Sequence, residues 1–154
     1  MRIAIGSDHA GYELKEHLKK LFADGHDWVD VGTDGPDSVD YPDYAVKVAR
    51  LVTQGGAEFG ILLCGTGIGM SVTANKVRGV RAALVFDLYT AMQSRRHTDA
   101  NILVLGAQVT GKGLASEIVK TWLGTSFEGG RHQRRIDKIK RFEDDFHGSP
   151  QGQR

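Results

Sequence analysis

Short, continuous apolar runs alternate along this chain with segments whose apolar residues recur at helical spacing. The runs 61–64 and 102–105 are apolar throughout, which is typical of strands covered on both faces. Such an alternation predicts a parallel sheet with helices on both sides and right-handed crossovers. The expected strands are 2–6, 28–31, 60–64, 81–85 and 102–106, and the expected helices are 11–22, 44–53, 68–76, 89–96, 113–123 and 131–146.

The bulk properties of the chain restrict its class. Its 154 residues suit one domain with its own core, here expected over 1–146, and the polar residues 147–154 are expected to form a flexible tail. The formal net charge is +1, so no overall field favours a nucleic acid or a membrane surface as partner. Neither a signal peptide nor a run of membrane-spanning length is recognisable.

Cys64 is the only cysteine. A single thiol cannot form an internal disulfide, which suits the reducing cytoplasm, where this chain is expected to reside. The six histidines show no His-Glu-x-x-His or comparable ligand spacing, and one cysteine cannot build a cysteine-rich zinc site. The sequence therefore predicts no metal and no cofactor.

Residues 59–76 carry the strongest chemical signal. An apolar strand ends at Cys64 and passes into Gly65, Gly67 and Gly69, followed by a helix-compatible segment. The thiol is thus expected at the tip of a strand, beside unpaired N–H groups at a helix start, which favour negative charge. A thiolate facing such donors can remove a proton while the resulting anion is stabilised, so the loop predicts an enzyme. The alternative is a small buried hydrophobic residue, the commonest role of a lone cysteine.

The glycine spacing also allows a nucleotide-binding interpretation. The loop is close to the dinucleotide pattern Gly-x-Gly-x-x-Gly but lacks its third glycine, and Asp87 follows the next expected strand, about where a ribose-binding acid would lie. The loop lies in the third strand–helix unit rather than the first, and it lacks the Gly-Lys-Ser/Thr ending of a P-loop. A nucleotide-binding module without catalysis stays an alternative.

Further polar residues follow the other expected strands, and ligands of parallel sheets collect at these carboxyl ends. Asp8 and His9 could bind sugar hydroxyls or phosphate, or cap the next helix. Tyr41 could pack against a ligand or on the domain itself. His97, at the end of an expected helix, could be a general acid or base, or a capping cation.

Two arginines near the C-terminus are spaced to act together. Arg131 and Arg135 are four residues apart, so on a helix they share one face and could hold one phosphate. Other basic residues lie close by, so a solvated basic face is the alternative.

These segments occur in an order that resembles the ribose-5-phosphate isomerase B family, which is grouped with the galactose-6-phosphate isomerase subunits. The motifs are Asp8-His9-Ala10-Gly11, Asp40-Tyr41-Pro42, Cys64-Gly-Thr-Gly-Ile-Gly69, Ala74-Asn75-Lys76, His97 with Asp99-Ala100-Asn101, and Gly129-Gly130-Arg131-His132-Gln133-Arg134-Arg135. The resemblance covers about residues 1–146. It implies a three-layer α/β/α sandwich around a five-stranded parallel Rossmann-like sheet of order 2-1-3-5-4.

The same resemblance implies an aldose–ketose isomerase that interconverts ribose 5-phosphate and ribulose 5-phosphate through an enediolate, without a metal. Cys64 would move the proton between C1 and C2, the loop amides would hold the enediolate, and Thr66 and His97 would open the sugar ring. The family's dimers or tetramers have sites between subunits, so His97 and the arginines are expected to face a partner's Cys64. The implied substrate contacts are Asp8, His9, Tyr41, Gly65, Gly67, Ile68, Gly69, Thr98, Arg131 and Arg135.

Two residues depart from the family pattern. Thr98 stands where asparagine is usual, and Gln108 stands where many members have arginine. Both are expected near the substrate, so an isomerase of another phosphosugar, such as allose 6-phosphate or galactose 6-phosphate, is an alternative.

Overall fold

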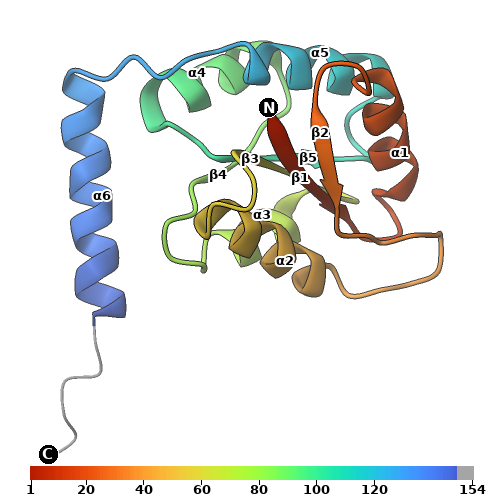
Figure 1. Cartoon of the computed structure of the whole chain (residues 1–154), viewed down its shortest axis with the longest axis horizontal. Coiled ribbons are helices and arrows are strands. Elements are labelled where there is room, and N and C mark those ends of the chain that lie inside the picture. The colour runs from red at the N-terminus through yellow and green to blue at the C-terminus, as the bar shows by residue number, and fades with distance from the viewer. Residues whose placement is uncertain (149–154) are drawn as a thin grey trace, which may run out of the picture.

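The chain folds around one parallel sheet (Figure 1), seen in a computed structural model that describes residues 1–148. The sheet has five strands in the order β2-β1-β3-β5-β4, as predicted. The strands are β1 (Arg2–Ser7), β2 (Asp27–Asp30), β3 (Phe59–Cys64), β4 (Ala82–Leu84) and β5 (Ile102–Gly106). The helices are α1 (Tyr12–Leu21), α2 (Tyr41–Thr53), α3 (Ile68–Ala74), α4 (Leu88–Thr98), α5 (Lys112–Leu123) and α6 (Arg131–His147).

Two apolar cores lie on opposite faces of the sheet, because side chains alternate along each strand. Ile61 and Leu63 join a core with α1, α4 and α5, whereas Leu62 and Cys64 join a second core with α2 and α3. The predicted single-domain α/β/α sandwich is therefore confirmed. The same alternation along β3 directs the Cys64 side chain toward α2 and α3.

Several boundaries differ from the sequence prediction. Helix α2 begins at Tyr41, three residues earlier than expected, because Pro42 in the first turn needs no hydrogen-bond partner for its nitrogen. Helix α4 continues to Thr98, so His97 lies in its last turn. Helix α6 extends one residue beyond the expected end, to His147; residues 149–154 of the expected tail lie outside the described residues.

Helix α6 stands beside the α/β body rather than in either helical layer (Figure 1). Gly129 and Gly130 both have positive φ, 67° and 55°, and lead into it; such backbone is open to glycine at little cost. Near its far end the Gly79 N–H donates to Glu143 Oε1 at 2.9 Å. We define the α6 stripe as Ile139, Phe142 and Phe146, which are 47%, 58% and 81% exposed and share one helix face by their spacing.

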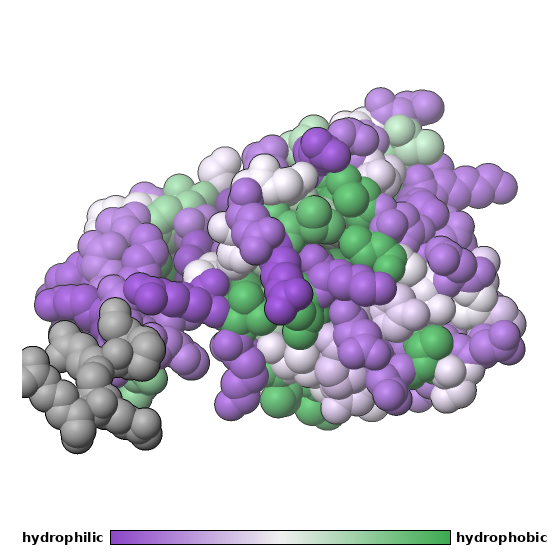
Figure 2. All heavy atoms as spheres, turned by 60° about the horizontal axis from the view of Figure 1, so that its bottom comes forward, coloured by the Kyte–Doolittle hydropathy of each residue, from purple (hydrophilic) through white to green (hydrophobic). Residues whose placement is uncertain are grey.

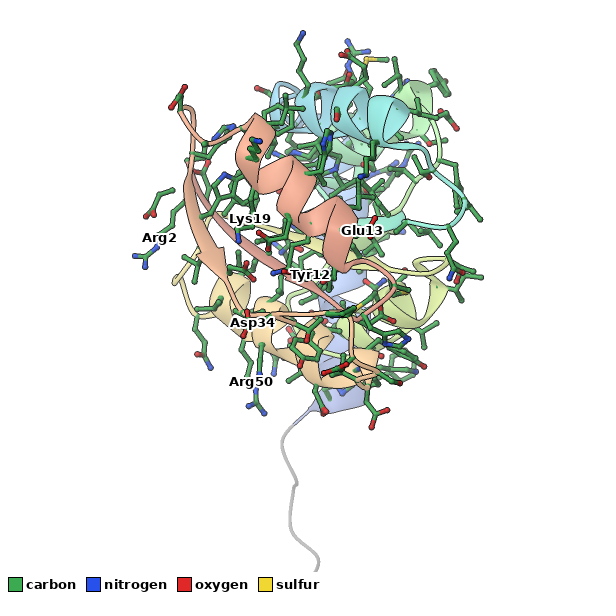
Figure 3. All side chains as sticks on the ribbon, turned by 90° about the vertical axis from the view of Figure 1, so that its right-hand side faces the viewer. Arg2, Tyr12, Glu13, Lys19, Asp34 and Arg50 are labelled. Carbon is green, nitrogen blue, oxygen red and sulfur yellow. The ribbon has the colours of Figure 1, made fainter. Side chains whose placement is uncertain are left out.

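A buried charge cluster ties α1 to the end of β2. Lys15 is fully buried, and its Nζ donates to Asp30 Oδ1 and Oδ2 at 2.8 and 2.6 Å. Figure 3 looks onto α1, with Lys19 directed toward β2; its Nζ also donates to Asp30 Oδ2. The Gly32 N–H donates to Asp30 Oδ1 at 2.9 Å, and Gly32 O in turn accepts from Ser7 N at 2.8 Å. The cluster therefore fixes the turn that lies against the end of β1.

We expect Asp30→Asn to lower the free energy of unfolding by about 3 kcal/mol at pH 7, because the buried Lys15 ammonium loses its two hydrogen bonds to a carboxylate and keeps only the more exposed Glu16, at 3.1 Å, as a counter-ion. Burial acts to raise the pKa of Asp30, but hydrogen bonds from Lys15, Lys19 and the Gly32 N–H outweigh it and lower that pKa below the ordinary 3.8. The stabilisation is therefore present above pH 3.8 and disappears as pH falls through the lower folded value. Urea unfolding at a series of pH values measures it.

The control is Asp27→Asn, which removes an ion pair with Arg2 between side chains that are 72% and 61% exposed. Such a pair contributes at most about 1 kcal/mol. If Asp30→Asn and Asp27→Asn lowered the free energy of unfolding equally, the buried cluster would be no more stabilising than the exposed ion pair.

No helix among residues 1–148 is both long enough and apolar enough to cross a membrane.

Candidate active site

The residues expected around the thiol meet at the carboxyl edge of the sheet. Ser7 pairs with Leu63, and Cys64 pairs with Gly106, so β1, β3 and β5 end side by side. The loops after β3 and β5 are joined by hydrogen bonds from Ala107 N to Cys64 O at 2.8 Å and from Gln108 N to Gly65 O at 2.9 Å. This edge is where parallel sheets bind ligands.

Cys64 ends β3 with its side chain on the α2–α3 side, and the residue is 4% exposed. The Gly67 N–H donates to its Sγ at 3.2 Å. The expected arrangement of a thiol beside a helix-start amide is therefore present. The residue also packs in the second core.

The loop glycines let neighbouring groups approach without a Cβ in the way. Gly67 has φ +81°, and a Cβ there would lie 2.5 Å from Leu84 Cδ1. A Cβ on Gly69 would lie 2.6 Å from the Tyr41 ring, so that ring packs on the first turn of α3. A Cβ on Gly65 would lie 2.8 Å from Gln108 Oε1. The loop is thus closed in by an aromatic ring and a carboxamide.

The other loop residues are open to solvent. Thr66 is exposed and its Oγ1 accepts from Ile68 N at 3.3 Å, while Ile68 is 58% exposed.

Asp8 and His9 follow β1 at the same edge. Asp8 is 6% exposed, and its Oδ1 accepts from Gly11 N at 3.0 Å, so one carboxylate oxygen serves the loop before α1. His9 is exposed, and its Nδ1 accepts from the Val39 N–H at 3.2 Å. In a neutral His9 this places the ring proton on Nε2, which is left to donate to a ligand.

His97 and Thr98 lie away from the glycine loop, in the last turn of α4. Helix α4 begins after β4 and runs back along the sheet, so its last turn lies toward the amino edge. Arg81, just before β4, donates from Nε to Thr98 O at 3.0 Å, and Asn101 O accepts from Gly60 N at the start of β3. From Gly60 to Cys64 the strand covers roughly 13 Å. One chain therefore places His97 and Cys64 toward opposite edges of the sheet.

The imidazole of His97 stacks on that of His132, with ring centroids 4.1 Å apart and planes inclined by 11°. Glu128 Oε2 lies 3.5 Å from His132 Nε2 and 3.9 Å from His97 Nε2. Burial, together with the positive charges of His97, Arg131 and Arg135, lowers the pKa of His132.

Sequence reasoning missed Glu128 and His132 as neighbours of His97. The only signal for them was their i, i+4 spacing, which spans the linker and the start of α6. Arg131 and Arg135 are exposed on this same helix. They accompany His97 rather than the glycine loop of their own chain.

One argument for the nucleotide-binding alternative was Asp87 as a ribose-binding acid, and the structure gives this residue another role. Asp87 is the N-cap of α4, and its Oδ1 accepts from Thr90 N at 2.7 Å. The carboxylate offered as a ribose ligand is therefore committed to a helix terminus.

Comparison with known proteins identifies the family. The sequence model of the Ribose/Galactose Isomerase family matches residues 3–139. The chain belongs to this family.

Its relatives match over nearly their whole length. The putative sugar phosphate isomerase YwlF of Bacillus subtilis is 51% identical over 146 residues, which are 94% of this chain and 98% of the relative. The structure of Clostridium thermocellum ribose-5-phosphate isomerase B superposes with a TM-score of 0.93 at 50% identity, covering 95% of this chain and 99% of that one. A Mycoplasma genitalium ribose-5-phosphate isomerase B with bound ribulose-5-phosphate gives a TM-score of 0.90 at 44% identity, covering 94% and 97%. The family resemblance drawn from the sequence is confirmed.

Proposed function

We propose that this chain is a sugar-phosphate isomerase that interconverts ribose 5-phosphate and ribulose 5-phosphate, with Cys64 as the base. The observation that carries the proposal is the Gly67 N–H donating to Cys64 Sγ at 3.2 Å. The Mycoplasma relative that binds ribulose-5-phosphate supports the choice of substrate. A working thiol also suits a reducing compartment such as the cytoplasm.

The chemistry requires a base and an anion site together, because a proton next to a carbonyl is only weakly acidic. The Cys64 thiolate takes the proton from C2 of the open-chain aldose, the C2–H electron pair forms the C1=C2 double bond, and the π pair of the carbonyl moves to its oxygen. The N–H groups of Gly65, Gly67, Ile68 and Gly69 stabilise the enediolate, as preorganised donors do in other enzymes. A proton passes between the two oxygens, and the thiol then returns its proton to C1, which gives the ketose.

Substrate binding and ring opening involve residues from both parts of the fold. Asp8 accepts from sugar hydroxyls, Tyr41 lines the pocket, and His9 donates from Nε2 toward the phosphate. Thr66 and His97 open the furanose ring, with Thr98 beside them. Arg131 and Arg135 hold the phosphate, which anchors the substrate away from the reacting carbons.

We propose that the site is completed by a second copy of the chain, in a homodimer or homotetramer. His97, Arg131 and Arg135 lie on α4 and α6, toward the other edge of the sheet from Cys64. The α6 stripe is exposed on a helix that stands beside its own α/β body and lies in neither helical layer. Figure 2, which brings the α2–α3 side forward, shows apolar groups open to solvent between polar ones. Exposed apolar surface of this kind is typical of protein interfaces.

Assays of ribose 5-phosphate, allose 6-phosphate and galactose 6-phosphate side by side test the substrate. We expect the highest kcat/KM with ribose 5-phosphate. Gln108, whose carboxamide lies against Gly65, is the structural reason to include the hexose phosphates. A preference for one of them would replace the pentose assignment while leaving the isomerase chemistry in place. Activity with none, together with thermal stabilisation by NAD or ATP, would favour the nucleotide-binding alternative.

Mixed chains test the shared site. Cys64→Ala and His97→Ala chains should each be nearly inactive, but unfolding and refolding them together should restore about a quarter of wild-type activity, since half of random dimers are hybrids with one intact site. The control mixes Cys64→Ala with the Cys64→Ala/His97→Ala double variant, which can form no intact site. Recovery no greater than in this control would show that each site is built within one chain.

A further inference from the structure

We propose that His97, Glu128 and His132 form a binding site for a zinc-class divalent cation, and that occupation of this site inhibits the enzyme. The three residues come from the last turn of α4, the linker before α6 and the first turn of α6. Their ligand atoms all lie within 4.8 Å of one another.

The spacing of the donor atoms is close to what a tetrahedral ion needs. With ligand bonds of about 2.1 Å, the donors of a tetrahedral zinc site lie roughly 3.4 Å apart. Here Glu128 Oε2 is 3.5 Å from His132 Nε2 and 3.9 Å from His97 Nε2. The same carboxylate oxygen thus faces both imidazole nitrogens. Two histidines and a carboxylate leave a fourth position for water.

The surroundings hold the donors in place. Arg96 Nε contacts the other carboxylate oxygen, Glu128 Oε1, at 2.9 Å, which leaves Oε2 directed at the histidines. His132 is 4% exposed, and Arg131 Nε donates toward its Nε2 at 3.5 Å. This contact leaves a lone pair on His132 Nε2 that is directed at the arginine, so a bound metal ion would replace Arg131 as its partner. Because the rings are stacked, both must turn about χ2 to aim their lone pairs at one ion, a torsion that is broad in histidine.

The donor set selects the cation. Imidazole nitrogens favour zinc, cobalt, nickel and copper over magnesium and calcium, which prefer all-oxygen sites. Arg131 and Arg96 place positive charge nearby, so we expect micromolar rather than tighter affinity. The inhibition rests on the ring-opening role proposed for His97, because an ion bound to Nε2 removes that nitrogen from acid–base chemistry. The binding itself does not depend on that role.

Cobalt(II) and zinc titrations test the site on the full-length protein. We expect one cobalt ion per chain, with visible bands of a four-coordinate ion that zinc displaces and magnesium leaves unchanged. Glu128→Gln should weaken binding at least tenfold, whereas His17→Ala, a histidine that contacts Ser116 instead, should leave it unchanged. Cys64→Ser should also keep the cobalt bands, since sulfur is not a ligand here. Loss of binding in Cys64→Ser, or equal binding by Glu128→Gln and wild type, would overturn the site.

Activity measurements test the consequence separately. Micromolar zinc should inhibit wild-type isomerisation, EDTA should reverse the inhibition, and Glu128→Gln should need at least tenfold more zinc. Metal binding without inhibition would overturn only the regulatory part of the proposal. An isomerase assay that shows no activity even without zinc would instead contradict the proposed function.

Discussion

Cys64→Ala is expected to lower kcat by at least about a thousandfold, toward the upper end of what general acid–base catalysis contributes. The Cys64 sulfur is ionisable and accepts from the Gly67 N–H. Alanine at this position leaves no base beside that donor. The protein should still fold, because removing one buried sulfur atom lowers the free energy of unfolding by only about 1 kcal/mol. Steady-state kinetics and thermal unfolding measure the two effects.

Cys64→Ser is the matched variant for this experiment. It keeps the size of the side chain and can accept from Gly67, but a hydroxyl is not ionised near neutral pH. We therefore expect a comparable loss, and no exchange of the C2 proton of the substrate with deuterated solvent. Turnover within tenfold of wild type in either variant would remove Cys64 from the role of base.

The second large effect is expected for Gly67→Ala. Its Cβ would lie 2.5 Å from Leu84 Cδ1 and 3.1 Å from the Leu105 backbone carbon, at a φ of +81°. The loop must therefore move, and its donors leave the positions in which they stabilise an oxyanion. Loss of one preorganised donor costs about 3 kcal/mol in other enzymes, so we expect kcat to fall by at least about a hundredfold.

Gly55→Ala separates backbone strain from the loss of the loop geometry. Gly55 has a similar φ of +78°, but a Cβ there meets nothing within 4 Å. It should cost about 1 kcal/mol of stability and leave the kinetics unchanged. If Gly67→Ala lowered stability but retained kcat, the amides of this loop would not be the anion site.

The sequence predicted the sheet well because its signals are local. The apolar runs at β3 and β5 are typical of strands covered on both faces, and both strands have the expected ends within one residue. The loops after β1, β3 and β5 also lie side by side, because parallel strands end at one edge of the sheet. The early start of α2 escaped prediction, since Tyr41 and Pro42 read as a loop.

The neighbours of His97 could not be predicted, because they depend on the path of a linker. Glu128 is held against α4 by its N–H, which donates to Arg96 O at 3.1 Å. His132 then reaches His97 through the turn made by Gly129 and Gly130, whose positive φ values are not visible in the sequence. The stacked rings of His97 and His132 follow from that turn. Tertiary placement of this kind leaves no periodic signal.

The position of α6 beside the α/β body has a consequence for how catalysis would respond to dilution. On the two-copy arrangement proposed above, a folded but solitary chain carries a base without its phosphate-binding arginines. Specific activity should then decline as the protein is diluted below the dissociation constant of the dimer, and a diluted sample should recover with a lag after it is concentrated. The number of working sites in a cell would therefore depend on the square of chain abundance when the protein is scarce.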